Sequence, residues 1–343
     1  MNPTQKFPIA IIGGGPAGLE AASVLAENGL SVKLFEAKSE WAENLKNKYK
    51  IFPDFSSAAD LIGQLTAKTE HANISKHLHT EITQISKDKD IWKLKDGNGK
   101  EYDASAVLLA AGYDVFDAKR KEEFGYGIYD GVITSVELEQ MLGSQRIINK
   151  LGEAPQRVVF LQCVGSRDEK TGNHYCSKIC CVTAVKQAIE VKKLIPKTEV
   201  FVFYMDLRMW GQHFEELYRE SQEQYNIRYV RGRISEASST FDGRIQIKAE
   251  DTLIGRPLKM TTDLLVLMVG MEASRGVRKL SEDCGICGEY GFAQSKNPHL
   301  CDNLTDRAGL FLAGACKRPM SITDVIADAR AAAVEIVKYL RDE

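Results

Sequence analysis

The chain has 343 residues, of which 44% are hydrophobic and 27% are charged, and its formal net charge is −2. This length suits two domains that each bury a core, and the near-neutral charge excludes a global attraction to nucleic acid. No apolar run approaches the roughly 20 residues that a membrane-spanning helix needs, which argues against membrane insertion.

The N-terminal segment and the cysteines indicate the compartment. The first apolar stretch runs directly into glycines, as a first strand does and a signal peptide does not. Eight cysteines without a secretory signal are typical of a reducing compartment, where thiols serve metal or redox chemistry. We therefore expect a cytoplasmic protein.

A dinucleotide-binding βαβ unit is predicted at the start of the chain, where an apolar run from residue 7 to 12 precedes a glycine-rich turn. Gly13 permits the tight turn, Gly15 lets the backbone approach a pyrophosphate, and Gly18 lets the helix pack on the strand. Glu36, at the end of the next strand, can accept hydrogen bonds from a ribose hydroxyl. The alternative is a glycine-rich turn without a ligand. The other residues expected at this site are Pro16, Ala17, Ala37 and Lys38.

Residues 38–118 continue this first domain. The pattern over residues 38–60 is polar and irregular, and Pro53 interrupts it. Residues 81–104 alternate as an antiparallel meander with a DGNG hairpin turn. An apolar strand then ends in Ala111 and Gly112, which we also expect at the cofactor. The charged residues 119–127 suit a crossover to a second domain, and residues 135–142 predict a short helix.

Residues 157–193 predict a strand, a loop with cysteines and a helix that begins near Ile179. Four thiols lie at this strand-to-helix junction with the spacing C-x12-C-x3-C-C, namely Cys163, Cys176, Cys180 and Cys181. Four thiolates suit a metal centre, whose negative charge the helix N-terminus and basic residues such as Arg167 can compensate. The spacing matches neither a ferredoxin nor a zinc ribbon. An iron–sulfur centre, a zinc site and four buried structural thiols all stay open on this pattern.

The second domain departs from the dinucleotide-binding pattern. Asp206, at the end of the strand predicted over residues 200–208, stands where such a domain places its ribose-binding acid. The glycine turn that should precede it is missing, and the cysteine segment stands there instead. Because cysteine side chains would crowd a pyrophosphate, we infer that the cysteines occupy the place of a nicotinamide dinucleotide.

The remaining sequence predicts further short strands over residues 227–248 and 258–260 and buried strands over residues 261–274 and 308–315. A helix is predicted from Ile322 to Leu340, with Ser321 as its N-cap and Asp324 at its third position. Cys284 and Cys287 form C-x-x-C, with Cys301 and Cys316 downstream. A structural role, a second metal site and a redox dithiol are all compatible with that spacing.

The segment FLQCVGSRDEKTGNHYCSKICCVTAVKQA, over residues 160–188, resembles the A-type subunit of heterodisulfide reductase. AAGYDVFD, LLVLMVGMEAS and GLFLAGACKRPMSITDV extend the resemblance over nearly the whole chain. It implies an α/β fold with two Rossmann-like domains, as in thioredoxin reductase and other flavoprotein disulfide reductases. It further implies a discontinuous FAD-binding domain over residues 1–118 and 280–343, and a second domain over residues 119–279 that carries a [4Fe–4S] cluster.

The resemblance also implies roles for single residues. Cys163, Cys176, Cys180 and Cys181 would ligate the cluster, and Lys186, in the AVKQA segment, would lie near flavin N5. The alternative for Lys186 is a solvated lysine on the helix surface. Gly314 and Pro319 match the last FAD motif, and the helix N-terminus that follows can meet the negative charge on the N1/O2 side of a reduced flavin. The C-terminal residues expected at FAD are Gly314, Ala315, Ser321 and Ile322.

Three departures from the family pattern stand out. The glycine pair that usually follows the first ribose acid is replaced around residues 39–45, and the cysteine of the last FAD motif is shifted to Cys316. No segment matches the ferredoxin modules of long family members. This stripped form resembles the A-type subunit of heterodisulfide-reductase-like complexes of cytoplasmic sulfur oxidation.

The expected function is therefore electron transfer between FAD and the cluster, in a complex with other subunits and with self-association as a homodimer. Three alternative functions are also compatible with the sequence. The first is the flavin subunit of a quinone-interacting oxidoreductase of sulfate reducers. The second is a stand-alone NAD(P)H-dependent disulfide reductase that uses Cys284 and Cys287. The third is a redox-inactive scaffold.

Overall fold

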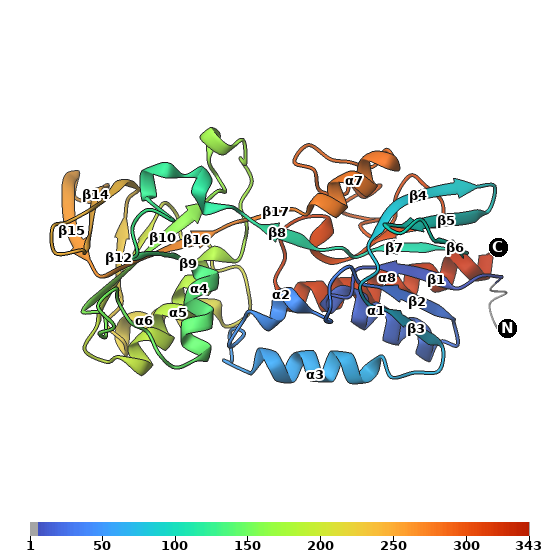
Figure 1. Cartoon of the computed structure of the whole chain (residues 1–343), viewed down its shortest axis with the longest axis horizontal. Helices are drawn as coiled ribbons and strands as arrows, with labels where there is room; N and C mark the ends of the chain where they lie inside the picture. The colour runs from blue at the N-terminus through green and yellow to red at the C-terminus, as the bar shows by residue number, and fades with distance from the viewer. Residues whose placement is uncertain (1–5, 343) are drawn as a thin grey trace. The chain divides into compact units, whose positions relative to one another are not determined.

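The computed structural model describes residues 6–342, and the chain divides into two compact units (Figure 1). Unit 1 comprises residues 1–46, 58–114 and 272–343, and unit 2 comprises residues 47–57 and 115–271. The chain passes from unit 1 to unit 2 between residues 114 and 115 and returns between residues 271 and 272. The sequence predicted these boundaries at 118/119 and 279/280. The outermost predicted limits, residues 1 and 343, lie outside the described residues. Residues 47–57 belong to unit 2, which the sequence did not predict.

A parallel sheet forms the centre of unit 1. Four of its five strands are short, mainly apolar runs, as expected where both faces of a sheet are covered; the exception is the edge strand at residues 74–77, ISKH. In spatial order they are β18 (Leu310–Leu312), β7 (Val107–Leu109), β1 (Ile9–Ile12), β2 (Val32–Phe35) and β3 (Ile74–His77). Because all run in the same direction, their carboxyl ends share one edge.

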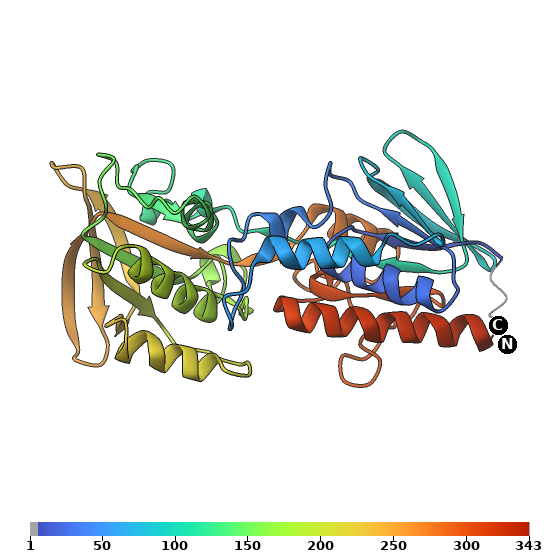
Figure 2. The same ribbon diagram turned by 90° about the horizontal axis from the view of Figure 1, so that it is seen from below.

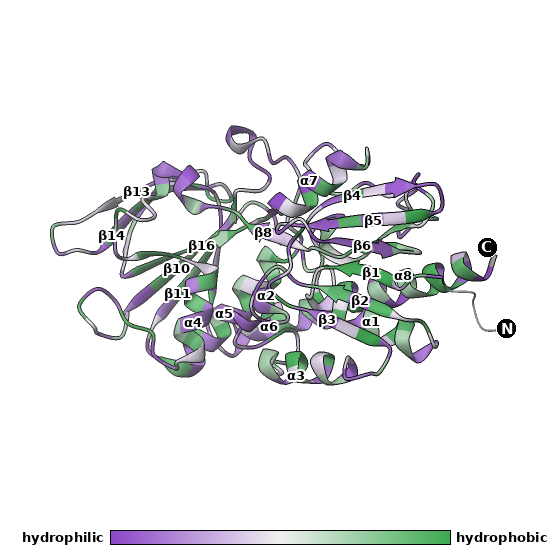
Figure 3. Ribbon diagram, turned by 45° about the vertical axis from the view of Figure 1, so that its right-hand side comes forward, coloured by the Kyte–Doolittle hydropathy of each residue, from purple (hydrophilic) through white to green (hydrophobic). Residues whose placement is uncertain are grey.

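Helices cover one face of this sheet and a meander covers the other (Figure 2). On the helical face lie α1 (Pro16–Glu27), α3 (Ala58–Lys68) and α8 (Ile322–Asp342), with α2 (Glu43–Lys46) beside α3, whereas α7 (Arg275–Asp283) packs on the meander. The predicted meander is present as β4 (Ile82–Asp88), β5 (Ile91–Asp96) and β6 (Glu101–Ala104). In Figure 3 the central strands β1 and β2 are hydrophobic, whereas β4 is largely hydrophilic, as its outer position requires.

Unit 2 repeats this architecture. Its parallel sheet has the order β12 (Arg228–Arg231), β11 (Glu199–Tyr204), β10 (Arg157–Val164), β16 (Leu264–Val269) and β9 (Val132–Thr134). One face packs on α4 (Ser135–Gly143), α5 (Cys180–Leu194) and α6 (Phe214–Glu223). The other face packs on the antiparallel strands β13 (Ile234–Ser239), β14 (Ile245–Asp251) and β15 (Arg256–Thr262).

Short elements complete the chain. The strands β8 (Tyr113–Val115) and β17 (Met271–Ala273) pair where the chain passes between the units. The 3-10 turns are η1 (Ala118–Arg120), η2 (Glu122–Phe124), η3 (Glu169–Thr171) and η4 (Gly314–Cys316). Within residues 6–342, no helix combines the length and the apolar character needed to cross a bilayer. The predicted α/β class with two Rossmann-like domains, the first discontinuous, is confirmed.

We call residues 47–57 the strap, because this segment leaves unit 1 and packs on the helical face of unit 2. Three aromatic side chains, Tyr49, Phe52 and Phe55, pack against the core beneath α5. The Phe52 ring meets the Phe214 ring edge to face with centroids 5.3 Å apart, and Lys193 Nζ lies 4.3 Å from the centroid of Phe55. Aromatic burial thus fixes the strap to unit 2.

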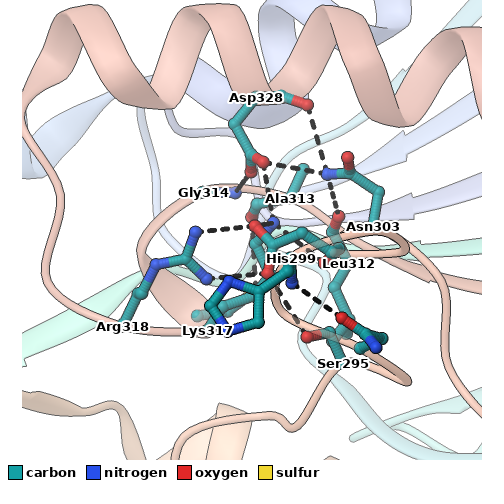
Figure 4. Close-up of polar contacts among 12 residues, drawn as sticks. Ser295, His299, Asn303, Leu312, Ala313, Gly314, Lys317, Arg318 and Asp328 are labelled. Carbon is teal, nitrogen blue, oxygen red and sulfur yellow. Dashed lines mark hydrogen bonds and ion pairs between the residues drawn. The ribbon is translucent and has the colours of Figure 1, made fainter.

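A buried ion network holds the loop after β18 in unit 1 (Figure 4). The side chain of Lys317 is 1% exposed, and its Nζ lies 2.8 Å from Asp302 Oδ2 and 2.7 Å from Asp328 Oδ1. Asp328 also accepts the amide hydrogen of Gly314 at 2.6 Å and a hydrogen bond from Asn303 at 2.9 Å. Asp328 on α8 therefore fixes the backbone of the turn that carries Gly314.

We predict that Asp302→Asn lowers the free energy of unfolding most at neutral pH. Burial opposes ionisation, but hydrogen bonds from Arg318 and Lys317 lower the pKa of Asp302 to about 2, against about 3.9 in an unfolded chain. A carboxylate with a depressed folded pKa stabilises the fold above its unfolded pKa and loses that effect as the pH falls through its folded pKa. Denaturant titrations should give a deficit of about 2 kcal/mol at pH 7 that shrinks between pH 4 and pH 2.

The matched control is Asp306→Asn, because Asp306 is exposed on the same loop. It should change the unfolding free energy by less than about 0.5 kcal/mol. An Asp302→Asn deficit that is independent of pH would contradict the role assigned to this carboxylate.

Candidate functional site

The glycine turn of unit 1 has the backbone that the sequence predicted. Gly13 has φ +114°, and a Cβ on it would lie 2.4 Å from the carbonyl oxygen of Ala110. A Cβ on Gly18 would lie 1.9 Å from the carbonyl oxygen of Gly13. Gly15, which precedes α1, has open space around its Cβ position, and Pro16 is the first residue of the helix. Two glycines are thus required by packing, and the third leaves room above the helix N-terminus for an anion.

The other predicted cofactor residues of unit 1 lie after the carboxyl ends of neighbouring parallel strands, where Rossmann folds bind nucleotides. Glu36 follows β2, and its carboxylate accepts the amide hydrogens of Gly14 at 2.7 Å and Lys38 at 2.9 Å. Each carboxylate oxygen keeps a second lone pair for a ribose hydroxyl. The remaining residues at this edge are Ala37, Lys38, Ala111, Gly112, Gly314 and Ala315.

The N-terminus of α8 has the predicted cap. The amide of Asp324 donates to Ser321 Oγ at 3.2 Å, and the amide of Ser321 donates to Asp324 Oδ2 at 3.3 Å. This reciprocal pair is a capping box. It fixes the start of the helix at Ile322, next to the turn that carries Gly314.

The cysteine loop of unit 2 joins the end of β10 to the start of α5. Its backbone folds back on itself, because the amide of Arg167 donates to the carbonyl of Tyr175 at 2.9 Å and that of Asp168 to Asn173 at 3.0 Å. Asp168 is buried and lies 2.7 Å from the buried ammonium of Lys121. The two ends of the loop therefore lie close together. As a result, the thiols of Cys163, Cys176, Cys180 and Cys181 interact electrostatically with one another.

Three of the four thiols are uncharged when no metal is bound. Burial, with a smaller contribution from the neighbouring Cys181, raises the pKa of Cys163 to about 12, while Arg167 acts in the opposite direction. Burial likewise raises the pKa values of Cys180 and Cys181, whereas Cys176 is only half-buried. A metal must displace these protons to bind, so metal affinity at this site increases with pH.

The surroundings of the thiols suit an anionic group. The amide of Lys178 donates to Cys176 Sγ at 3.3 Å. In the described chain, no side chain caps α5 at Ile179 and its first turn carries no acidic residue, so the helix dipole is available to a negative charge. Next to Cys163, buried polar atoms of Gln162, Ser166 and Arg167 have no hydrogen-bond partner within residues 6–342. Buried polar atoms of this kind are usually satisfied, so these three side chains are candidates for contact with a bound group.

The same described residues contain no three His, Cys, Asp or Glu side chains that converge on the position of a single metal ion. In an iron–sulfur cube each thiolate binds a different iron atom, so a cube does not require the four sulfurs to converge on one point. The number of donors, their chemistry and the compensating positive charge fit such a cube.

Asp206, the predicted counterpart of a ribose acid, is already engaged. Its carboxylate lies 2.6 Å from Arg167 and 3.9 Å from Arg231. These arginines lower the pKa of Asp206, and the hydrogen bond from Arg167 is the largest cause. A carboxylate held in this way has less capacity to accept a ribose hydroxyl, which agrees with the predicted loss of nucleotide binding in unit 2.

Lys186 is not the solvated surface lysine of the alternative prediction, because its side chain is 1% exposed. Its Nζ lies 2.6 and 2.9 Å from the carboxylate oxygens of Glu139 and 3.1 Å from Glu190. It also donates to the carbonyl of Lys50 in the strap at 2.7 Å. Proximity to a flavin stays a prediction. Sequence reasoning missed this network, although the Lys186–Glu190 spacing of four residues was a usable signal.

The C-x-x-C cysteines lie in unit 1 as free thiols. Cys284 is the C-cap residue of α7, and burial raises its pKa to about 11. Burial also raises the pKa of Cys287, and Cys316 is fully buried with its thiol directed at the carbonyl of Leu109. A nucleophilic thiol needs a lowered pKa, which helix N-termini rather than C-termini supply. The geometry therefore favours structural roles.

The comparisons with known proteins agree with this geometry. Residues 7–149 match the family model described as pyridine nucleotide-disulphide oxidoreductase. The thioredoxin reductase of Lactococcus lactis has the same fold, with a TM-score of 0.70 and 18% identity over 98% of this chain and all of that one. The thioredoxin reductase of T. acidophilum superposes with a TM-score of 0.69 at 17% identity, over 97% of this chain and 98% of that one.

Sequence relatives are more specific. The A-type iron-sulfur subunit of the CoB–CoM heterodisulfide reductase of Methanocaldococcus jannaschii is 42% identical over 237 residues, which cover 66% of this chain and 36% of the relative. The A-type subunit of a ferredoxin-dependent CoB–CoM heterodisulfide reductase from Methanosarcina acetivorans is 30% identical over 99% of this chain and 54% of the relative. The chain thus spans between about a third and about half of the length of these relatives. On these similarities and its two-domain fold, the chain belongs to the family of A-type subunits of heterodisulfide reductase.

Proposed function

We propose that the chain is an electron-transfer subunit that carries FAD in unit 1 and a [4Fe–4S] cluster in unit 2. The observation that carries this proposal is the gathering of four thiols at the start of α5, in the half of the molecule where Asp206 is already paired with arginine. FAD takes or gives two electrons, and an iron–sulfur cluster passes them one at a time. The role of the fold would then be to position the two centres and to tune their potentials.

The FAD assignment rests on the glycine turn and the shared strand edge of unit 1. Gly13, Gly15 and Gly18 would hold the pyrophosphate and Glu36 the ribose. The N-terminus of α8 would face the negative charge of the reduced flavin. The matching family model and the thioredoxin reductase fold support this assignment.

The cluster assignment rests on Cys163, Cys176, Cys180 and Cys181 as the four ligands. Arg167 and the N-terminus of α5 would compensate the negative charge of the cluster. The Methanocaldococcus jannaschii relative is named an iron-sulfur subunit, which supports the presence of such a centre in the family.

Substrate chemistry on sulfur compounds would then occur on other subunits of a heterodisulfide-reductase-like complex, with cytoplasmic sulfur oxidation as its cellular role. The subunit names of the relatives support a multi-subunit setting. Self-association as a homodimer is part of the same proposal. The raised pKa values of Cys284 and Cys287 argue against a stand-alone disulfide reductase, which needs an activated thiol.

Gly15→Ala tests the FAD site. The added methyl group meets no atom of the protein within 4 Å, so the fold should tolerate it, but it would intrude where the backbone approaches the pyrophosphate. We expect at least a tenfold loss of FAD affinity, measured by the flavin absorbance retained after dialysis and by titration with FAD. The control Gly63→Ala adds a methyl group to open space in α3 and should retain full flavin. Equal flavin content in the two variants would contradict the assignment.

Cys176→Ser tests the cluster ligands. Cys176 is less buried than Cys163, Cys180 and Cys181, so its hydroxyl analogue should fold. Anaerobically purified wild-type protein should contain about four iron and four sulfide per chain, and the variant less than half of that. Cys301→Ser, at a half-buried cysteine of unit 1, serves as control and should leave both contents unchanged. Full iron and sulfide in the Cys176→Ser protein would remove this thiol from the ligand set.

Anaerobic purification of the tagged chain from its native cell tests the partners. We expect it to carry flavin and iron and to bring down further subunits that handle sulfur substrates. Quinone-linked partners instead would favour the sulfate-reduction alternative. A lone chain whose flavin is rapidly bleached by NAD(P)H would contradict the proposal, because it would act as a complete reductase.

A further inference from the structure

Three ionisable side chains, Lys186, Glu190 and Glu139, form a buried group next to the part of α5 that lies between one and three turns beyond the cysteine loop. Lys186 and Glu190 belong to α5, and Glu139 comes from α4. All three side chains are less than 5% exposed. With both glutamates ionised the group would carry a net charge of −1 in an apolar core, an arrangement that burial opposes strongly.

The two glutamates differ in how well the protein satisfies them. The Glu139 carboxylate accepts hydrogen bonds from Lys186 at 2.6 and 2.9 Å, from the Gln187 side chain at 2.7 Å and from the amide of Tyr49 at 2.9 Å. Within residues 6–342, neither oxygen of Glu190 accepts a hydrogen bond of good geometry, and its ion-pair partner is the ammonium of Lys186, at 3.1 Å. Glu139 is therefore the stabilised anion, and Glu190 is the group that gains most from a proton.

The charged groups that act on Glu190 are Lys186 on its own helix, Glu139 on α4 and Lys50 on the strap. The strands of the sheet and α6 contribute apolar and aromatic side chains to this core. Burial raises the pKa of Glu190 to about 7, with Lys186 opposing this and Glu139 adding to it. The proton therefore exchanges within the physiological pH range.

The group is also coupled to the start of the helix. Glu190 lies nine residues beyond Cys181, which is roughly 13 Å along the axis of α5. Lys48 of the strap interacts electrostatically with Cys180 as well as with Glu139 and Lys186. A charge added at the cysteine loop is therefore felt by the buried carboxylates, through a core of low dielectric constant.

We propose that Glu190 is a redox-linked proton site, which takes up one proton from solvent when one electron enters the centre at the start of α5. The inference rests on the proposed function, because it needs a redox centre held by the cysteines. The charges balance: one electron arrives from a one-electron donor, one proton arrives from water, and the carboxylate becomes a carboxylic acid. Reoxidation releases the electron to an acceptor and the proton to solvent. Lys186 then pairs with Glu139 alone while the centre is reduced.

The test uses Glu190→Gln, which keeps the size of the side chain and removes the titrating group. The midpoint potential of the iron–sulfur centre is measured by dithionite titration followed by electron paramagnetic resonance at several pH values from 6 to 8. We expect the wild-type potential to fall as the pH rises through about 7 and the Glu190→Gln potential to be independent of pH. Glu190→Asp, which keeps a carboxyl group, should restore the pH dependence with a shifted midpoint. The exposed control Glu223→Gln should match the wild type.

Infrared difference spectra of the same samples identify the group directly. Reduction should produce the carbonyl band of a protonated carboxylic acid in the wild type and in Glu223→Gln, and no such band in Glu190→Gln. Equal pH dependence in wild type and Glu190→Gln, or a persistent band, would overturn the proton site alone. Iron and sulfide analysis of each sample separates this outcome from failure of the proposed function, because a wild type without iron would overturn both.

Discussion

Unit 2 depends on a single physical constraint, the gathering of four thiols at the N-terminus of α5. Burial keeps Cys163, Cys180 and Cys181 protonated, and a Rossmann-like domain that binds a nucleotide in this place has glycines instead. The cysteine loop makes a long excursion, which the buried Lys121–Asp168 pair anchors. Arg167 has two roles, because its positive charge favours the thiolate form of Cys163 and its guanidinium forms an ion pair with Asp206. The residues that we propose as a metal site thus also replace the free acid and the glycines that a pyridine nucleotide would need.

The strap links this constraint to the rest of unit 2. It places Lys48 within electrostatic reach of Cys180, and it supplies a backbone carbonyl to Lys186 and a backbone amide to Glu139. The buried ammonium of Lys186 contacts the carboxylates of Glu139 and Glu190 and the carbonyl of Lys50. These contacts fix its position more firmly than that of a lysine on a helix surface. The helix α5 therefore carries two of the proposed cluster ligands, Cys180 and Cys181, at its first turn and a buried charge group two turns later, on one rigid element.

Much of this could be predicted from the sequence, because local chemistry decides it. The glycine turn at Gly13 and Gly18 follows from the space a Cβ would need, and the cap of α8 follows from Ser321 and Asp324. The strap was not predictable, because residues 38–60 have no periodicity and their aromatic side chains find their partners only in tertiary packing. The role of Glu139 was invisible for the same reason, since it lies 47 residues from Lys186. The domain boundaries shifted by several residues, because β8 and β17 form their own pairing where the chain crosses.

We propose that an iron–sulfur cube takes the place of a pyridine nucleotide in unit 2. Anomalous X-ray scattering at the iron edge from anaerobically grown crystals measures this most directly. We expect four iron peaks enclosed by the sulfur atoms of Cys163, Cys176, Cys180 and Cys181, with no nucleotide density beside Asp206. Nicotinamide density in that position, or four sulfurs without iron under strict exclusion of oxygen, would contradict it.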